Sequence, residues 1–368
     1  MQLKLFETEI RKTGYVLENE IAIVLRGSGW TVISNKYYVD DSEDSVREMD
    51  LIAYKAARVQ HFDVYTTLII SCKKSEDNAW ALLARELNEK DPNSDWWPLH
   101  AWTNDKALQY QFGLAGAARR YHDAASAYGV KDAMSLPPVE VFAFQEMDKT
   151  SGKPKNDKPI YSSVTSLMKA QAYEMAALPT RKRSPAVYQF NLLSVIDTTL
   201  LRLMFDKTKI KCTERDTEHY LARYIIRKRE IFARIRFIGL RAFASILEDY
   251  GRLHKFNCEW LASECDAFYE GLVKDWKRTG VLIESFKNKI HWFLSWRIEW
   301  QLKKDVSVGA PTLYWNEEAS ELSVGFGLPE DILFFLNTDA ESRQRIAAAL
   351  KDIYRYEGPF SVTHDVPF

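Results

Sequence analysis

Apolar positions in the first half of the chain follow two rhythms, one helical and one strand-like. In residues 6–26 apolar positions recur every three or four residues. This spacing predicts a helix, which Gly27-Ser28-Gly29 ends. Strand-like segments lie at 30–39, 49–54, 66–71, 99–103 and 139–145. Further helices are predicted at 78–87 and 105–128. This order favours an α/β domain, a mixed sheet flanked by helices.

In the second half of the chain the predicted strands come first and the predicted helices follow them. Strands are predicted at 187–196, 200–205, 220–226 and 231–238, and helices at 239–250, 258–276 and 281–303. A hairpin at 312–326 and a last helix from Thr338 or Asp339 follow. Between the halves, 162–178 has helical spacing, and the polar stretches 148–158 and 179–185 are breakers. We therefore expect one domain at 1–150 and a separate α+β domain at 185–368, with the boundary in 150–185.

Composition narrows the class of protein. The 368 residues are 46% hydrophobic, which is typical of a globular chain and excludes disorder. The formal net charge of −1 excludes a uniformly basic coat for nucleic acid, although a local basic face is compatible with it. Four cysteines without a C-x-x-C pair, and seven dispersed histidines, indicate neither a disulfide framework nor a zinc site. The chain has no apolar run of about 18 residues and no signal-peptide core, so we expect a cytoplasmic protein without a membrane segment.

Candidate chemistry gathers in residues 14–75. Asp50 stands at the edge of one apolar strand and Lys73 at the end of the next. A charge buried alone costs several kcal/mol, so each needs a partner or a metal ion. Neighbouring strands lie about 4.8 Å apart, so the two side chains would share a site if these strands pair. A plain salt bridge across the two strands is the alternative.

Three segments together resemble the PD-(D/E)xK nuclease superfamily, which has the restriction-endonuclease-like fold. The helix resembles the Mrr-like pattern through Gly14, Leu17, Glu18, Ile21, Ala22, Leu25, Gly29, Trp30 and Val32. Asp50 matches the motif aspartate, and Ile69-Ile70-Ser71-Cys72-Lys73-Lys74-Ser75 is similar to the second half of the motif. Ser71 departs from the pattern, because the superfamily usually has Glu or Asp there.

The resemblance implies a Mg²⁺ or Mn²⁺ site that hydrolyses DNA phosphodiester bonds. It makes Asp50 the primary ligand, Lys73 the catalytic lysine and Glu18 the helix acid. Glu20, two residues further on, is the alternative helix acid, and Cys72 would offer its carbonyl oxygen. Ser71 removes one charge from the metal site, so we expect a weak or conditional nuclease.

A basic run between Arg223 and Arg241 supplies candidate contacts to nucleic acid. Alternation along 231–238 places Arg234 and Arg236 together on the face opposite the apolar residues. Such a face could bind phosphates, and Arg227 and Lys74 are added as candidate contacts. The alternative is a salt-bridged surface sheet.

Two other patterns have simpler interpretations. Trp292, Trp296 and Trp300 form one helical stripe that could stack on unpaired bases, although a core position is the favoured interpretation. The acidic residues at 40–44 lack the spacing of a calcium loop and predict a solvated hairpin turn.

Three functions remain open at this point. The leading hypothesis is a metal-dependent nuclease acting on DNA, in bacterial (antiviral) defence or DNA processing by analogy of fold. The first alternative is an inactive module of the same fold that binds DNA or a protein partner. The second is a structural subunit of an assembly. The C-terminal domain would bind nucleic acid, form a homodimer or receive a partner.

Overall fold

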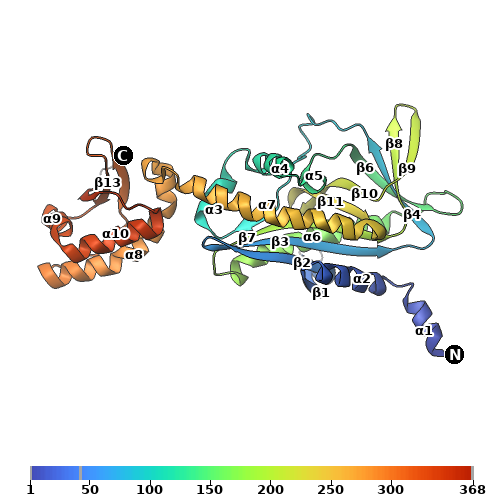
Figure 1. The fold of residues 1–368 in the computed structure, drawn as a ribbon, viewed down its shortest axis with the longest axis horizontal. Helices are drawn as coiled ribbons and strands as arrows, with labels where there is room; N and C mark the ends of the chain where they lie inside the picture. The colour runs from blue at the N-terminus through green and yellow to red at the C-terminus, as the bar shows by residue number, and fades with distance from the viewer. Residues whose placement is uncertain (1, 41–43, 366–368) are drawn as a thin grey trace. The chain divides into compact units, whose positions relative to one another are not determined.

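The computed structural model describes residues 2–40 and 44–365, which form an α/β protein with mixed sheets. The chain divides into two compact units. The first unit holds the chain up to Asp105 and Gly116–Trp260, and the second holds Lys106–Ala115 and the chain from Leu261 onward. Figure 1 labels helices and strands of both units.

The first unit contains most of the strands. Its helices are α1 (Gln2–Ile10), α2 (Gly14–Gly27), α4 (Ala117–Ala127), α5 (Lys131–Met134), α6 (Lys158–Arg181) and α7 (Phe243–Tyr269, as far as Trp260). Its strands are β1 (Thr31–Asp40), β2 (Ser45–Val59), β3 (Phe62–Lys74), β4 (Asn78–Arg85), β5 (Ala101–Thr103), β6 (Glu140–Asp148), β7 (Ala186–Asp197), β8 (Leu200–Asp206), β9 (Lys209–Glu214), β10 (Thr217–Ile226) and β11 (Arg229–Gly239).

The described residues of this unit build one large and one small sheet. The large sheet runs β1-β2-β3-β7-β11-β10, and β5 pairs with β7 beside this path. β3, β7 and β11 are parallel neighbours, whereas β1, β2 and β10 pair antiparallel. The small sheet runs β6-β4-β8-β9. β3 is therefore an inner strand, paired with β2 on one side and with β7 on the other.

The large sheet is buried on both faces. On one face, Leu17, Ile21 and Leu25 of α2 pack with residues of α4 and α7 against alternate residues of the inner strands. On the other face, α6 packs against the intervening strand residues, such as Ile69. Two-sided burial leaves β3 and β7 almost continuously buried, since parallel strands between helix layers have no face to expose. Figure 1 shows α7 lying across this sheet.

The second unit packs helices against a small sheet. It contains α3 (Lys106–Gly113), the end of α7, α8 (Trp276–Leu302), α9 (Glu330–Thr338), α10 (Ala340–Tyr354), β12 (Thr312–Asn316), β13 (Glu321–Phe326) and β14 (Phe360–His364). Strands β12 and β13 form the expected hairpin, and β14 pairs parallel to β13. The last helix begins after Asp339, whose side chain accepts a hydrogen bond from the Ser342 backbone N–H.

Several predicted elements differ from the observed ones. Residues 78–87, predicted as a helix, contain strand β4, because this apolar segment completes ladders with β6 and β8. The helix predicted at 6–26 is two helices, α1 and α2, and the one predicted at 105–128 is also two, α3 and α4. Two helices predicted at 239–250 and 258–276 are largely joined in the single helix α7.

The observed division of the chain also differs from the predicted one. The expected boundary in 150–185 falls inside the first unit, because β7 pairs with β3 from Asp63↔Ala186 to Lys74↔Asp197. Strands after residue 185 therefore complete the sheet begun before residue 75. The described helices include none that is both long enough and apolar enough to cross a membrane.

Candidate active site

Asp50 and Lys73 lie together at one end of β2 and β3. The antiparallel ladder ends at the pair Leu51↔Ile70. Asp50 directly precedes Leu51 and therefore lies one position beyond the end of the ladder. There Asp50 Oδ2 accepts a 2.7 Å hydrogen bond from the backbone N–H of Cys72 and lies 3.8 Å from Lys73 Nζ. The two side chains are 21% and 32% exposed, so solvent reaches both. The expected sharing of one site by Asp50 and Lys73 is therefore present in the geometry.

Glu18 approaches the same place from α2. Its neighbours Leu17, Ile21 and Leu25 are buried in the core, which fixes the rotation of the helix and holds Glu18 half-buried. The pKa of Glu18 is raised, first by desolvation, then by the negative charges of Asp50 and Glu48, while Lys73 partly offsets the rise. Such a carboxylate carries excess negative potential that a bound cation would relieve. Glu20 is exposed on α2, so the geometry favours Glu18 as the helix acid.

Glu48 is a carboxylate that the sequence analysis missed. It lies two residues before Asp50, and side chains two apart on a strand point to the same face. Its Oε1 accepts a 2.6 Å hydrogen bond from Asn35 Nδ2, and its charge acts on Glu18. The spacing Glu48-x-Asp50 was the available signal, but it does not distinguish a site residue from a polar strand end.

Ser71 is buried close to these carboxylates. It is 4% exposed, and its hydroxyl has no hydrogen-bond partner among the residues that the structure describes. A cavity of about 10 Å³ lies beside it, lined among others by Glu48, Asp50 and Leu167 of α6. A buried hydroxyl without a partner costs free energy, so this position is poorly suited to the serine as it stands.

Cys72 and Lys74 have different surroundings from those of Lys73. Cys72 is buried in the core, and desolvation together with the charges of Asp50 and Glu18 raises the pKa of its thiol well above the usual value. Its backbone, not its thiol, therefore participates in the site. Lys74 Nζ donates to the Arg11 carbonyl at 3.0 Å and lies 3.1 Å from Asp197. Lys74 is thus held on the β7 side of β3, away from β2.

The chemistry of the donors fits a hard divalent cation, although they do not form a complete shell. Mg²⁺ keeps several waters and needs only one or two carboxylates, which Asp50 and Glu18 can supply. The part of the chain that the structure describes contains no group of three or more His, Cys, Asp or Glu side chains arranged to hold a metal ion.

No family model, curated protein or solved structure matches this chain. The resemblance seen in the sequence therefore rests on the residues of this chain alone.

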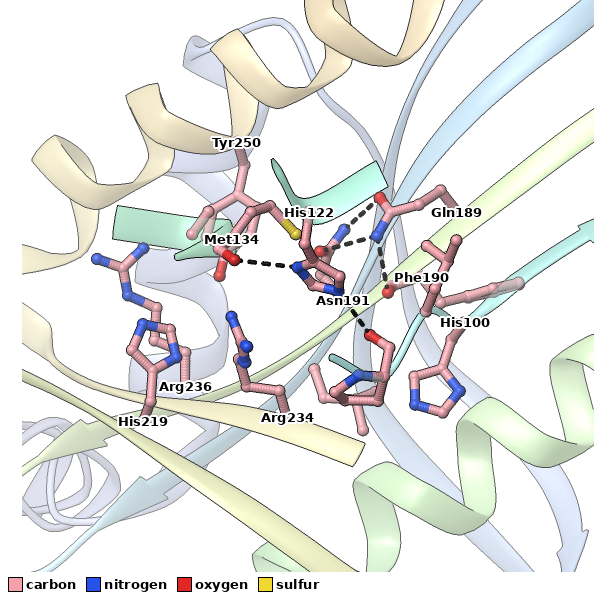
Figure 2. Close-up of a pocket in the computed structure, with 14 residues that line it drawn as sticks. His100, His122, Met134, Gln189, Phe190, Asn191, His219, Arg234, Arg236 and Tyr250 are labelled. Carbon is pink, nitrogen blue, oxygen red and sulfur yellow. Dashed lines mark hydrogen bonds between the residues drawn. The ribbon is translucent and has the colours of Figure 1, made fainter. Parts of the chain in front are cut away.

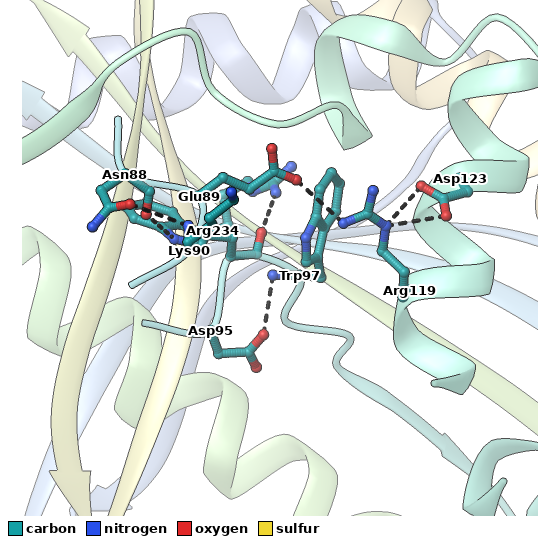
Figure 3. A network of polar contacts seen from close by, with 9 residues as sticks. Asn88, Glu89, Lys90, Asp95, Trp97, Arg119, Asp123 and Arg234 are labelled. Atoms are coloured by element: carbon teal, nitrogen blue, oxygen red, sulfur yellow. Dashed lines mark hydrogen bonds and ion pairs between the residues drawn. The ribbon is translucent and has the colours of Figure 1, made fainter. Parts of the chain in front are cut away.

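The expected basic outer face at Arg234 and Arg236 is not present. The alternation along β11 is as predicted, with Ala233, Ile235 and Phe237 in the core. The opposite face is covered by the segments around residues 96 and 135. Arg234, which is labelled in Figure 2 and Figure 3, donates to the carbonyls of Trp96 and Ser135 at 2.7 and 2.8 Å.

The covering segments leave Arg234 half-buried and Arg236 buried. Arg236 is 3% exposed and bonds Thr217 and Asp249. Trp97, next to Trp96, packs under the guanidinium of Arg119, 4.1 Å from the ring centroid (Figure 3).

Arg227 lies in the exposed turn between β10 and β11 with a positive φ of 51°.

The tryptophan stripe of α8 is also different from the prediction. Trp292, Trp296 and Trp300 are 70%, 42% and 61% exposed, so the favoured core interpretation is wrong. A second apolar stripe on the same helix supplies the core contacts, through Leu282, Phe286, Ile290, Leu294 and Ile298. The hairpin turn predicted at 40–44 falls partly at 41–43, outside the described residues; β1 and β2 pair on either side of it.

Proposed function

We propose that the first unit is a metal-dependent nuclease that hydrolyses DNA phosphodiester bonds. The observation that carries this proposal is the grouping of Asp50, Lys73 and the Cys72 backbone at one strand end, with the charge of Glu18 acting on it. A structural salt bridge alone does not account for Glu18, whose pKa is raised by desolvation and then by the negative charges of Asp50 and Glu48. Bacterial defence or DNA processing is the setting suggested by the resemblance.

Each residue has a distinct role under this proposal. Asp50 and Glu18 hold the cation, and Glu48 adds negative charge next to them. The Cys72 N–H orients the Asp50 carboxylate, leaving Oδ1 directed away from that bond. Lys73 Nζ, 3.8 Å from Asp50, is too far for a short charge-assisted hydrogen bond and can turn toward a phosphate oxygen.

A bound Mg²⁺ or Mn²⁺ would polarise the phosphodiester and lower the pKa of a water molecule. The residues of the chain position both reactants. Lys73 stabilises the charge that develops on the phosphate, while α2 keeps Glu18 facing the strand end. Ser71 adds no charge, so the affinity for the cation rests on Asp50, Glu18 and Glu48.

The test is cleavage of supercoiled plasmid by the full chain with Mg²⁺ or Mn²⁺. Asp50→Asn and Lys73→Met are expected to reduce the rate at least 100-fold. Asp63→Asn and Lys182→Met are the matched controls, because they also remove a carboxylate–lysine ion pair, of 3.3 Å, but at the other end of β3. Calorimetric titration with Mn²⁺ provides a second readout, in which Asp50→Asn weakens binding and Lys73→Met does not.

The result that would overturn the proposal is wild-type protein that neither cleaves DNA nor binds Mn²⁺. Equal loss of activity in the Asp63 and Lys182 controls would likewise show that only the stability of the strand pair matters.

The second candidate is a module of the same fold that binds DNA or a protein partner without cleaving. Ser71 favours it, since the neutral side chain leaves the shell one carboxylate short. The exposed tryptophan stripe of α8 also favours it, because large exposed aromatic patches mark interaction surfaces. Retardation of DNA at low salt, with Mn²⁺ binding absent, would select this candidate.

A further inference from the structure

A row of aromatic rings lies on α8 in the second unit. Phe293, Trp296 and Trp300 form this aromatic row: the ring centroids of Phe293 and Trp296 are 6.1 Å apart, and those of Trp296 and Trp300 are 6.4 Å apart. The planes of the two tryptophan rings differ by only 19°. Because another stripe of α8 fills the core, these two tryptophans are left facing solvent.

The exposed side chains around the aromatic row include no aliphatic one. In residues 289–303, the aliphatic side chains are half-buried at Leu302 and buried at the other three positions, Ile290, Leu294 and Ile298. A helix that lies in a lipid headgroup layer or in a groove of another protein usually presents Leu, Ile or Val along with its aromatic residues. Exposed rings without aliphatic neighbours are better suited to a flat aromatic partner.

A cation stands at each end of the aromatic row. Lys303 Nζ lies 4.9 Å from the ring centroid of Trp300, and the guanidinium carbon of Arg345 lies 5.8 Å from that of Phe293. Both cations are exposed, and no ion pair between the described residues includes either of them.

The acids near the aromatic row do not cancel these two charges. In the sequence of residues 289–303, Glu299 is the one acid, and its side chain is exposed. The acids that reach α8 from α9 and α10 pair with other cations of that segment, as Asp339 does with Arg297. Two cations therefore stand against one carboxylate at the row, which makes the local charge weakly positive.

The length of the row fits a short run of stacked bases. An α-helix rises about 1.5 Å per residue, so Phe293 to Trp300 covers about 10 Å. Bases repeat about every 3.4 Å along a stacked strand, so the row has room for about three of them. Every base has a π-face that stacks on an aromatic ring whatever the sequence. That face is accessible when the base is unpaired, which selects a single strand over a duplex.

We propose that the aromatic row of α8 binds single-stranded DNA. Bases stack on the three rings, and Lys303 and Arg345 attract the phosphates that join them. Stacking supplies most of the affinity, because the second unit contains more acidic than basic residues and so lacks a broad positive field. The choice of DNA over RNA rests on the proposed nuclease function, whereas a DNA contact in the second unit goes beyond it.

The first test measures the fluorescence anisotropy of a labelled oligothymidylate of about 12 nucleotides with the full chain, in EDTA so that no cleavage occurs. Trp296→Ala and Trp300→Ala are each expected to weaken binding roughly 5–100-fold, the usual effect of removing one stacking ring. Trp276→Ala is the matched control, because Trp276 is a 71% exposed tryptophan at the start of the same helix, outside the row. Equal affinity in the wild type and all three variants would overturn the proposal.

A comparison of ligands separates stacking from other modes of binding. Trp296→Ala should leave the affinity for duplex DNA unchanged, because paired bases do not offer their faces. An equal loss for duplex and single strand would overturn the proposal. So would tighter binding of oligouridylate than of oligothymidylate, Trp296-dependent binding to phosphatidylserine vesicles, or a wild-type dimer that Trp296→Ala dissociates.

The salt dependence tests the part played by the cations. Lys303→Met should flatten the slope of log affinity against log salt by about 0.7, the value for one phosphate contact to a single strand. Lys351→Met is the control, because this exposed lysine pairs with Glu357 and lies outside the row. An unchanged slope in Lys303→Met would contradict the phosphate contact.

Photochemical crosslinking needs no variant. An oligodeoxynucleotide that contains 5-bromodeoxyuridine is irradiated with the full chain, and the crosslinked peptide is identified by mass spectrometry. The expected peptide contains Trp296 or Trp300, and crosslinks confined to other parts of the chain would refute the proposal. Failure of plasmid cleavage with intact oligothymidylate binding would count against the nuclease alone, and the reverse result against the aromatic row alone.

Discussion

Asp50 Oδ2 and Lys73 Nζ lie 3.8 Å apart on β2 and β3, just past the end of their ladder. Charge-assisted hydrogen bonds are about 2.7–2.9 Å long, so this pair is close without being fully engaged. The backbone N–H of Cys72 already bonds the same Asp50 oxygen at 2.7 Å. Lys73 is thus held near the carboxylate while remaining available to a third group.

The raised pKa of Glu18 predicts a pH dependence of stability. The folded state holds this proton more tightly than the unfolded state, so its stabilising contribution is present below the ordinary pKa of 4.5 and lost as the pH rises through the raised value. Glu18→Gln should therefore be more stable than the wild type at pH 7, by about 0.5 kcal/mol because the half-exposed side chain is screened by solvent. Denaturant unfolding at pH 4 and pH 7 measures this, and an equal difference at both values would contradict it.

Glu48 is expected to contribute to cation binding although it is outside the sequence motif. Glu48→Gln removes a negative charge that acts on Glu18, while its hydrogen bond to Asn35 Nδ2 can be kept through the amide oxygen. Affinity for Mn²⁺ should fall roughly tenfold, as is typical for groups next to the ligands. Calorimetry with Asp63→Asn as the control measures the change, and an unaltered affinity would remove Glu48 from the site.

Ser71 allows a prediction in two directions. Ser71→Ala removes a buried hydroxyl that has no partner, so it should be neutral or stabilise the protein by up to about 1 kcal/mol. Ser71→Glu restores the motif acid but must fit beside a cavity of only about 10 Å³. Without metal it should lower the melting temperature, and added Mn²⁺ should recover the loss and raise the cleavage rate. If the melting temperature of Ser71→Glu does not change with Mn²⁺, position 71 does not face the cation.

Arg236 should affect stability more than DNA binding. Arg236→Met breaks a buried ion pair, and because Arg252 still contacts Asp249 the cost should be about 2–3 kcal/mol. Arg229→Met, which is exposed, should cost less than about 0.5 kcal/mol. The salt dependence of DNA affinity should be the same for folded Arg236→Met and wild type. A flatter salt dependence in Arg236→Met would restore this arginine as a phosphate contact.

The sequence patterns were most informative where a continuous apolar run marks an inner strand of the sheet. The strands around Asp50 and Lys73 were located correctly, since a continuous apolar run ending in a charge is specific enough to place both residues. The segment 78–87 was misassigned because Ala79, Trp80, Leu82 and Leu83 suit a helix and a buried strand equally well. Only the ladders with β6 and β8 decide between them, and those partners lie about 60 and 120 residues away.

The errors at Arg234 and Trp292 have a common physical origin. Alternation and helical spacing show which residues share a face, but they do not show what covers that face. The polar face of β11 is covered by segments from around residues 96 and 135, so Arg236 is buried and Arg234 is half-buried. In α8 two apolar stripes compete for one core, and Ile290, Leu294 and Ile298 occupy it. The pattern alone does not rank the two stripes.

The pairing of β3 with β7 determines how the protein can be divided. A fragment ending near residue 150 would contain every residue of the candidate active site but would lose β7 and α6. The inner strand β3 would then become an open edge, apolar along most of its length, with unpaired N–H and C=O groups. Such edges recruit strands from other molecules, so the fragment should aggregate rather than act as a minimal enzyme.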